Sequence, residues 1–401
     1  MAEYSWISDL IDEARYTVSR YIHKTPLDHS RTFSEMAGFP VLLKYENLQK
    51  TGSFKVRGAI YKISKIKDSV NGVVAASAGN HAQGVAYAAR SFGIKAVIVM
   101  PENASISKVE ATRSYGAEVI LYGSTFDDAL AKAREIASEK GYELVHAFDD
   151  PYIIAGQGTL GVEILEDDPG IDTIVVPIGG GGLISGIALA VKRIKPSIRI
   201  IGVEPENAAS MKKSLEAGKP VKVEVKPTIA DGLAVKSPGK LTFSIVRDLV
   251  DDIVTVSEKE ISRAVYLLLE RSKTLAEGAG AASLAAILSG KAGSGKTVAV
   301  ISGGNIDLTL IYRIVLHGLA SNRRISYIEG YVPDMPGVLA RISSIIASRR
   351  GNILDVIHDR VDLNAPAWHT RIKIIFEIPG EEEKKSIENE LRRQGFNLRV
   401  G

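Results

Sequence analysis

Thr51-Gly52-Ser53-Phe54-Lys55-Val56-Arg57-Gly58-Ala59 is the stretch around which this chain is organised. It places Lys55 directly between Phe54 and Val56. An amine that loses hydration among apolar neighbours is neutral more often, and a neutral amine is a nucleophile. An ordinary solvated lysine in the first turn of a helix explains the same residues, so this stretch alone leaves both interpretations open.

Strands and helices alternate around this stretch. Short aliphatic and β-branched runs are each followed by a pattern of helical period, with Gly or Pro between them. Such alternation predicts parallel sheets covered by helices. The expected strands are 41–45, 73–76, 96–100, 118–121, 173–178, 198–203, 253–256 and 297–301.

The pattern changes after Arg324. Strand, helix, two strands, helix and strand follow one another in about 75 residues, the βαββαβ order of a ferredoxin-like domain. We therefore expect a core of residues 1–322, with a smaller lobe at about 45–150, and a separate domain of residues 323–401. The expected elements of that domain are strand 326–332, helix 338–349, strands 353–361 and 370–378, helix 381–393 and strand 396–400.

The composition excludes several classes of function. The 401 residues include 50 Lys and Arg against 47 Asp and Glu, a net charge of +3, which gives no reason to expect a nucleic-acid or membrane partner. The absence of cysteine excludes disulfides, thiolate metal sites and cysteine nucleophiles. The amphipathic, acid-containing N-terminus does not look like a signal peptide, and no apolar run reaches the roughly 18 residues of a membrane span. We expect a soluble cytoplasmic protein.

Four consecutive glycines join an expected buried strand to a helix that begins near Leu183. They are Gly179, Gly180, Gly181 and Gly182. Residues without a side chain let backbone N–H groups converge on an anion, and the helix N-terminus adds a favourable dipole. A merely flexible loop would use ordinary turn residues at lower entropic cost. The spacing is not that of a dinucleotide-binding or Walker loop, so we expect a phosphate bound in another way.

A second glycine-rich stretch, residues 290–297, does match the Walker pattern GxxxxGK[ST]. A nucleotide loop of that kind follows a strand and precedes a helix. Here the expected helix comes first and the strand second. We interpret residues 290–297 as a solvated turn and the match as accidental.

Two polar turns also follow expected strands. Ser77-Ala78-Gly79-Asn80-His81 lies where a strand ends and a helix begins, and Ser302-Gly303-Gly304-Asn305 has the same position later in the chain. The side chains of Ser77 and Asn80 could simply cap the helix, or they could seat a carboxylate together with its N–H groups. Because open parallel sheets bind ligands at the carboxyl ends of their strands, both turns are candidate site segments.

Taken together, SFKVRG around Lys55, SAGNHAQG from Ser77, the glycine loop and SGGN from Ser302 resemble the motifs of one family. They are similar to those of the pyridoxal-phosphate enzymes of the tryptophan-synthase-β fold type, and among these the threonine and serine dehydratases. The resemblance covers residues 1 to about 320, with the motifs in the family's order. It implies a two-lobed α/β core, pyridoxal 5′-phosphate as cofactor and an amino acid as substrate.

The resemblance also implies a role for each matching residue. Lys55 matches the lysine that carries the cofactor, and Phe54 the aromatic residue packed on its ring. Asn80 matches the donor to the cofactor's 3′-oxygen, and Ser302 the partner of its pyridine nitrogen. The phosphate cup is matched by Gly179, Gly180, Gly181, Gly182 and Leu183. The turn around the substrate carboxylate is matched by Ser77, Asn80 and His81.

Two departures from the family pattern carry information. Related serine racemases have a serine at the position of Ala78 as a proton donor, and alanine cannot donate a proton. Many relatives bind a cation after a Val-Glu-Pro stretch; Glu204 and Ala208 match that site, but Ser210 replaces its last carboxylate. We expect no metal, because the other histidines also lack ligand spacing.

Residues 326–401 resemble an ACT domain, the small amino-acid-sensing module of metabolic enzymes. Asp334-Met335-Pro336-Gly337 and Gly351-Asn352 match its ligand loop, with Asp334 where relatives often have asparagine. The resemblance implies an effector site at Asp334, Gly337 and Asn352. Because such domains bind effectors between paired copies, it also implies a homo-oligomer, a dimer or a tetramer.

The expected activity is the deamination of L-threonine to 2-oxobutanoate and ammonia, and also of L-serine to pyruvate, with amino-acid regulation. Isoleucine and valine are the first candidate effectors, because threonine deamination feeds branched-chain synthesis in relatives. Two alternatives remain open: a serine racemase or another β-eliminating enzyme of this fold, and a non-enzymatic amino-acid sensor. The intact Lys55 argues against the sensor.

Overall fold

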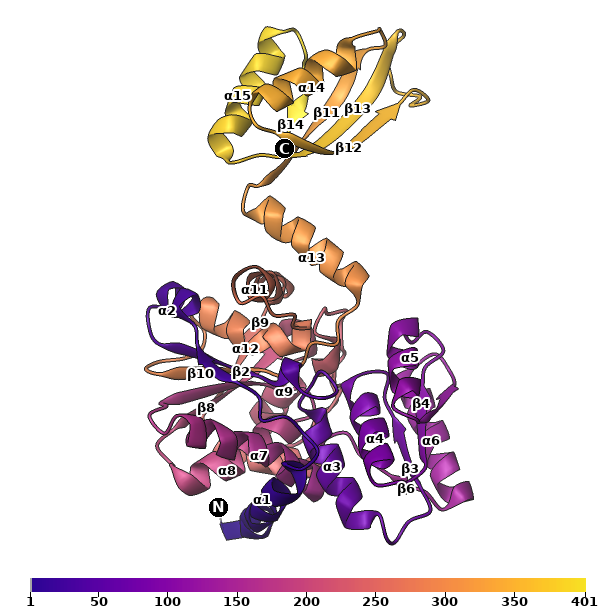
Figure 1. The fold of residues 1–401 in the computed structure, drawn as a ribbon, viewed down its shortest axis with the longest axis vertical. Helices are drawn as coiled ribbons and strands as arrows, with labels where there is room; N and C mark the ends of the chain where they lie inside the picture. Colours follow the sequence, from indigo (N-terminus) through magenta and orange to yellow (C-terminus); the bar gives the residue numbers. More distant parts are fainter. Residues whose placement is uncertain (1) are drawn as a thin grey trace. The chain divides into compact units, whose positions relative to one another are not determined.

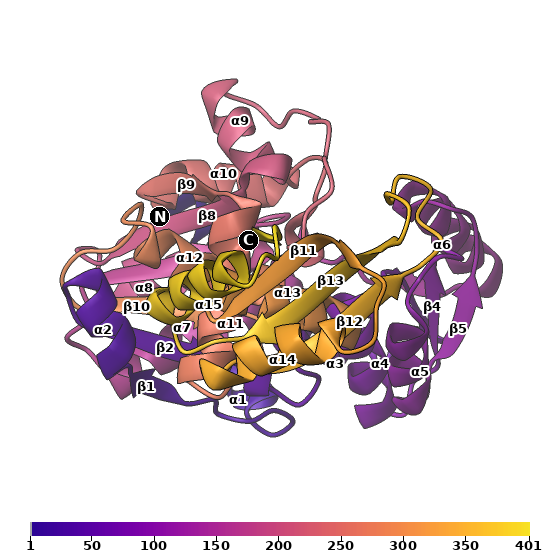
Figure 2. The ribbon, with the colours of Figure 1, turned by 90° about the horizontal axis from the view of Figure 1, so that it is seen from above.

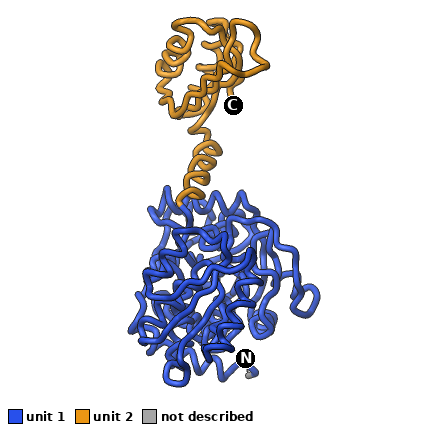
Figure 3. Tube along the Cα trace, turned by 90° about the vertical axis from the view of Figure 1, so that its right-hand side faces the viewer, with its two compact units in different colours: residues 1–307 blue, residues 308–401 orange. Residues whose placement is uncertain are grey.

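The computed structural model describes residues 2–401 and divides into two compact units (Figure 3). Unit 1 comprises residues 1–307, and unit 2 comprises residues 308–401. Helix α13 (Leu308–Ser321) therefore belongs structurally to unit 2. The domain boundary predicted from the sequence near Asn322, after this helix, stays a prediction.

Unit 1 is built on a six-stranded sheet that is parallel except for its first strand (Figure 1). Strands β7 (Thr173–Pro177) and β10 (Thr297–Ile301) are completely buried, because their aliphatic and β-branched residues pack against helices. Helix α12 (Gly278–Leu288) packs on both of them, and α8 (Gly182–Ile194) packs on β7. The order across the sheet is β1 (Leu27–His29), β2 (Val41–Tyr45), β10 (Thr297–Ile301), β7 (Thr173–Pro177), β8 (Arg199–Pro205) and β9 (Asp252–Val256).

A second, four-stranded parallel sheet forms the smaller lobe of unit 1. Its order is β5 (Glu118–Leu121), β4 (Ala96–Met100), β3 (Val73–Ala76) and β6 (Glu143–Leu144). Helices α4 (Asn80–Ser91) and α6 (Phe126–Lys140) pack on β3 and β4. Helix α3 (Lys55–Ile66) contacts α4 on one side and α7 (Pro151–Asp167) on the other, so it joins the lobe to the helices of the larger sheet. The two sheets, parallel except at β1, confirm the predicted two-lobed α/β fold.

Local sequence signals fix several helix ends. Thr125 and Asp128 cap each other's backbone N–H groups at the start of α6, and Ser257 and Glu260 do the same for α11 (Glu258–Arg271). Helix α6 ends at Gly141 in a left-handed conformation. The remaining helices of unit 1 are α1 (Ser5–Val18), α2 (Arg31–Ala37), α5 (Ile106–Ser114), α9 (Ser210–Glu216) and α10 (Lys240–Leu249).

Unit 2 contains α13 and the predicted βαββαβ domain, which is confirmed. Its antiparallel strands lie in the order β12 (Asn352–Asp359), β13 (His369–Glu377), β11 (Ile325–Pro333) and β14 (Arg399–Val400). Figure 2 shows α14 (Val338–Ser348) and α15 (Glu381–Arg393) over the same face of these strands. The alternating residues Ile372, Ile374 and Phe376 are buried on that face. Across residues 2–401, no helix is both long enough and apolar enough to span a bilayer.

Candidate active site

Lys55 is the first residue of α3, and the loop after β10 holds the residues before it. The N–H of Phe54 donates to the carbonyl of Ser302 at 3.1 Å, and Ser53 forms an isolated β-bridge with Gly303. The lysine stretch and the Ser302 turn, far apart in the sequence, therefore meet at the carboxyl end of β10.

The amine of Lys55 has lost much of its hydration. Its Nζ donates to the carbonyl of Ala147 at 2.9 Å and lies 5.3 Å from the centre of the Phe54 ring. Burial lowers the pKa of this amine from 10.5 to about 8, against the opposing effect of the Glu277 carboxylate. Near neutral pH the folded protein thus keeps a larger fraction of this lysine neutral than water would.

The four glycines lie between the end of β7 and the start of α8. Gly181 has a φ of +96°, a left-handed conformation that residues with a side chain rarely adopt. No side chain caps α8, and among the described residues no backbone carbonyl accepts from the N–H groups of Gly179, Gly180 or Gly181. Together with the helix dipole, these N–H groups can bind an anion, and Leu183 follows inside the helix as predicted.

The ring of Phe148 lies directly on the glycine loop. A Cβ at Gly180 would stand 2.2 Å from a ring carbon of Phe148, so a side chain there requires the ring to move. The loop that carries this ring is held by His146, whose Nδ1 accepts from the N–H groups of Phe148 and Asp149 at 3.3 and 2.9 Å. Because Ala147, which accepts from Lys55, precedes Phe148, this loop also brings the lysine near the glycines. Phe148 was not among the predicted site residues.

The side chain of Asn80 is fixed at both ends. Its Nδ2 donates to Oε1 of Glu277 at 2.6 Å, and its Oδ1 accepts from Nδ2 of Asn305 at 2.7 Å. Asn305 also donates to the carbonyl of Thr51 at 2.9 Å, which ties the amide to the lysine stretch. One N–H of Asn80 remains available, as its predicted role as a donor requires.

Glu277 and Asn305 were not predicted as site residues. Glu277 is 5% exposed, and its own N–H donates to the carbonyl of Gly303 at 3.1 Å. Burial and the charge of Asp231 raise the pKa of Glu277 to about 8, although the hydrogen bond from Asn80 favours its ionised form. The sequence did contain a signal for Glu277. This acidic residue directly precedes a run of small and apolar residues, which predicts a buried helix and therefore a carboxyl group close to the core.

Ser77 and His81 lie in the turn between β3 and α4 with Asn80. The hydroxyl of Ser77 accepts from the N–H of Gly79 at 3.2 Å. The ring of His81 is buried, with Nε2 2.9 Å from the carbonyl of Val145, and burial together with the nearby Lys55 charge lowers its pKa to about 3. His81 is therefore neutral at physiological pH, and its predicted part in holding the substrate carboxylate stays a prediction.

Glu204 uses its carboxylate as a helix cap. It accepts from the N–H groups of Met211 and Lys212 at 2.8 and 2.9 Å at the start of α9, and burial raises its pKa to about 7. Within residues 2–401, no group of three His, Cys, Asp or Glu side chains is arranged to hold a metal ion.

The predicted effector residues lie at the ends of elements in unit 2. Gly337, with a φ of +87°, precedes α14, and the exposed Asn352 begins β12. Oδ1 of Asp334 accepts from Nη2 of Arg360 at 3.1 Å. Their role in binding an effector stays a prediction.

The residues of unit 1 fit the expected cofactor. Pyridoxal phosphate needs an amine for covalent attachment, an anion site for its phosphate and polar partners for its ring. Lys55 is a desolvated amine, the glycine loop offers N–H groups without protein acceptors, and Asn80 has a free N–H. The hydroxyl of Ser302, 2% exposed at the end of β10, can meet the ring nitrogen.

Comparisons with known proteins agree with this fit. The family described as pyridoxal-phosphate dependent enzyme matches residues 18–303, and the ACT domain family matches residues 326–396. The L-threonine ammonia-lyase of Thermotoga maritima is 48% identical over 393 residues, 97% of this chain and 98% of that protein. The catabolic L-threonine dehydratase TdcB of Escherichia coli K12 is 49% identical over 314 residues, 77% of this chain and 95% of that protein. Maize serine racemase has a similar structure, with a TM-score of 0.73 and 41% identity over 78% of this chain and 98% of its own.

Proposed function

Because the chain belongs to the pyridoxal-phosphate-dependent threonine ammonia-lyases that carry a C-terminal ACT domain, we propose that it converts L-threonine to 2-oxobutanoate and ammonia under amino-acid control. The same site would take L-serine to pyruvate, since serine differs from threonine only by a methyl group. In both cases a Cα proton and the β-hydroxyl are lost as water, and water returns when ammonia is released.

The desolvated amine of Lys55 is the observation that carries the proposal. Its pKa of about 8 suits a group that must be neutral to attack and must then accept a proton. It donates to Ala147, whose neighbour Phe148 lies on the glycine loop, and the charge of Glu277, which holds Asn80, acts on it.

Each residue of the site has a proposed part in the reaction. When bound, pyridoxal phosphate withdraws the electron pair left on Cα. The glycine loop holds its phosphate, Asn80 donates to its 3′-oxygen, and the Ser302 hydroxyl meets the ring nitrogen. Lys55 anchors it and takes the proton from Cα. The turn of Ser77, Asn80 and His81 orients the substrate by its carboxylate.

Replacement of Lys55 by alanine tests the proposal. Lys55→Ala should reduce 2-oxobutanoate formation by at least about 10³-fold, because it removes both the anchor and the base. Its circular dichroism spectrum and unfolding temperature should remain those of a folded protein. Lys50→Ala, five positions earlier on an exposed turn, is the matched control and should keep full activity. Oxo-acid production by Lys55→Ala at the normal rate would contradict the assignment.

Serine racemisation is the second candidate, supported by the similarity to maize serine racemase. It is the weaker candidate because Ala78 offers no proton donor for the opposite face of the substrate. Incubation with L-serine, followed by chiral chromatography and an oxo-acid assay, separates the two. We expect pyruvate without D-serine, and D-serine as main product would favour a racemase.

The ACT domain is the proposed regulatory part, with an amino-acid effector bound near Asp334, Gly337 and Asn352 and with isoleucine and valine as first candidates. A homo-oligomer, a dimer or a tetramer, would bring two such loops together. Light scattering on the full-length enzyme, with and without isoleucine, measures the oligomer and its dependence on the effector.

A further inference from the structure

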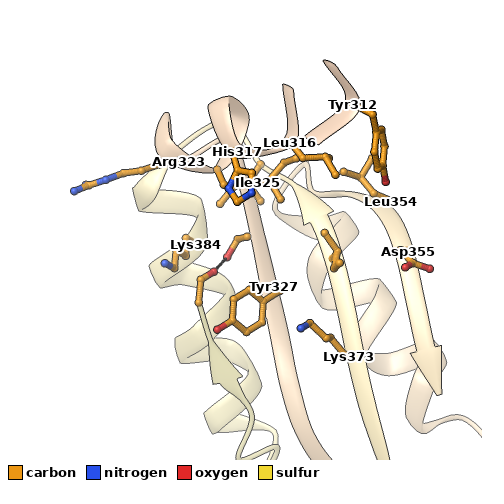
Figure 4. A pocket seen from close by; sticks show the side chains of 15 residues that line it. Tyr312, Leu316, His317, Arg323, Ile325, Tyr327, Leu354, Asp355, Lys373 and Lys384 are labelled. Carbon is orange, nitrogen blue, oxygen red and sulfur yellow. Dashed lines mark hydrogen bonds between the residues drawn. The ribbon is translucent and has the colours of Figure 1, made fainter. Parts of the chain in front are cut away.

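Unit 2 contains a cavity of about 620 Å³ between α13 and the open face of the four-stranded sheet (Figure 4). Helix α13 contributes Tyr312, Leu316 and His317, and the floor is formed by strands β11, β12 and β13. The opposite face of the same sheet is covered by α14 and α15. The cavity therefore uses the one face of the strands that those two helices leave open.

The strand register brings one acidic and one basic side chain together on the floor. Asp355 pairs with Ile375 across β12 and β13, and Ile375 pairs with Tyr327 across β13 and β11. Lys373 lies two residues before Ile375 and so faces the same side. Asp355 and Lys373 are thus diagonal neighbours on adjacent strands, a spacing that long side chains can bridge.

An irregularity in β12 helps to form this arrangement. The pairing of β12 with β13 shifts between Ile353 and Asp355, so that the consecutive residues Leu354 and Asp355 both line the cavity. In a regular strand two consecutive side chains would face opposite sides. The bulge places an aliphatic side chain next to the carboxylate.

The two charges on the floor differ in their pairing. Asp355 is exposed, and among the described residues it has no ion-pair partner within 4.0 Å. The Nζ of Lys373 lies 5.0 Å from the centre of the Tyr327 ring and forms a loose ion pair with Glu329 at 3.7 Å, which is longer than a good hydrogen bond and leaves the ammonium able to donate to a second carboxylate. The rest of the lining has an aliphatic part and a basic part. The aliphatic residues are Leu316, Ile325, Leu354, Ile375 and Ile378, and the basic residues are His317, Arg323 and Lys384.

A carboxylate and an ammonium on adjacent strands, next to an aliphatic wall, complement a free amino acid with an apolar side chain. We propose that this cavity binds an aliphatic amino acid such as L-isoleucine, with its carboxylate at Lys373, its ammonium at Asp355 and its side chain under α13. The inference rests on the proposed amino-acid regulation and gives it a second location. Asp334, Gly337 and Asn352 do not line this cavity. Its volume falls in the range of small-molecule sites and leaves room for water beside the ligand.

The sequence position of α13 gives such binding a route to the active site. The helix begins directly after Asp307, whose Oδ1 accepts from the hydroxyls of Ser105 and Ser107 in the smaller lobe. Asn305, two residues earlier, holds the amide of Asn80. A ligand that ties α13 to the strands of unit 2 restrains the helix that follows these residues. If the ligand binds one arrangement of α13 more tightly than another, it shifts the helix toward that arrangement. The change in activity is then limited by the difference between the two affinities.

Isothermal titration of the full-length, cofactor-loaded enzyme with L-isoleucine tests the proposal. Lys373→Met and Asp355→Asn should each weaken binding about 10-fold or more, because each removes one charge-assisted contact. Lys385→Met, an exposed lysine of α15 outside the cavity, is the matched control and should bind as the unaltered enzyme does. The KM for threonine should stay unchanged in all three, which separates this cavity from the active site.

Ligand analogues test the two contacts separately. The carboxylate 3-methylpentanoate lacks the ammonium, so it should bind the unaltered enzyme more weakly than isoleucine and should not be weakened further by Asp355→Asn. Isoleucine affinity within about twofold of normal in both variants would overturn the proposal. A loss of isoleucine binding that occurs only in Gly337 and Asn352 variants would also overturn it. A change of oligomeric state in Lys373→Met would overturn it as well, because this face would then be an interface between copies. If the enzyme turns over threonine but binds no isoleucine or valine, the cavity proposal fails and the proposed reaction stands.

Discussion

The amide of Asn80 depends on two residues that lie far from it in the sequence. Glu277 accepts from its nitrogen and Asn305 donates to its oxygen, so the amide cannot rotate without breaking both hydrogen bonds. The orientation of the remaining N–H, which is expected to meet the cofactor, follows from this pair. Glu277 is therefore a positioning residue.

Glu277→Gln should release the amide of Asn80 from this fixed orientation. Glutamine keeps the size but presents an amide nitrogen as readily as an oxygen, and a nitrogen cannot accept from Asn80. We expect kcat for threonine to fall by about 10-fold or more, with a shift in the absorption band of the bound cofactor and a smaller change in KM. Glu216→Gln, at the exposed end of α9, serves as the control. A normal kcat and a normal spectrum would show that Asn80 does not rely on Glu277.

His81 should make the folded protein sensitive to acid. Its pKa is lowered from 6.5 to about 3 by burial and by the Lys55 charge, so the unfolded chain binds more protons between these values. This contribution to stability is complete above pH 6.5 and is lost as the pH falls toward 3. At pH 5 the loss amounts to about 2 kcal/mol.

The test compares urea unfolding at pH 7 and pH 5. His81→Gln keeps a donor for the carbonyl of Val145 but does not titrate, so its stability should fall less than that of the unaltered protein between the two pH values. His358→Gln, at an exposed position in β12, should behave as the unaltered protein does. Equal losses in all three proteins would exclude His81 as the acid-sensitive group.

At the scale of elements, the glycine loop and the Phe148 loop form one packed layer. Gly180→Ala would place a methyl group 2.2 Å from the Phe148 ring, so ring or loop must move. We expect the affinity for pyridoxal phosphate, measured by equilibrium dialysis, to fall about 10-fold or more. Gly380→Ala is the control, because a Cβ there meets its nearest atom at 3.6 Å.

A double variant tells the origin of this effect. If the clash with Phe148 is the cause, Gly180→Ala combined with Phe148→Ala should recover part of the lost cofactor affinity, because the ring no longer occupies the space. No recovery would mean that the methyl group obstructs the phosphate itself.

The same elements show what the sequence could predict. Strands β7 and β10 and the βαββαβ order of unit 2 were predictable, because β-branched runs and helical periods are local signals. The link between Asn80 and Glu277 spans 197 positions and comes from tertiary packing alone. Phe148 left no motif either, since its role depends on the absence of a side chain in a distant loop. The sequence pattern of α13 is helical whichever unit the helix joins, so its place in unit 2 comes from the structure alone.

At the scale of the whole molecule, the proposed chemistry and the proposed sensing fall in different units. Every proposed residue of the reaction lies in unit 1, and the cavity and the predicted effector loop lie in unit 2. The E. coli relative matches only 77% of this chain but 95% of its own length, so a shorter protein of this family exists. A core that folds without the ACT strands is therefore expected.

Removal of residues 326–401 should leave an enzyme that binds its cofactor and turns over threonine at a rate close to that of the full chain, because the site keeps all its partners. It should also lose the response to isoleucine and valine, since both proposed effector locations need the ACT strands. Coupling between sites is typically about 1–3 kcal/mol, so the full chain should show an effector-dependent change of about 5- to 150-fold that the truncated chain lacks. The measurement is the rate of 2-oxobutanoate formation against effector concentration for both proteins. If the truncated enzyme responds to the same amino acid at the same concentration, the effector acts within residues 1–325, and regulation by the ACT domain is wrong.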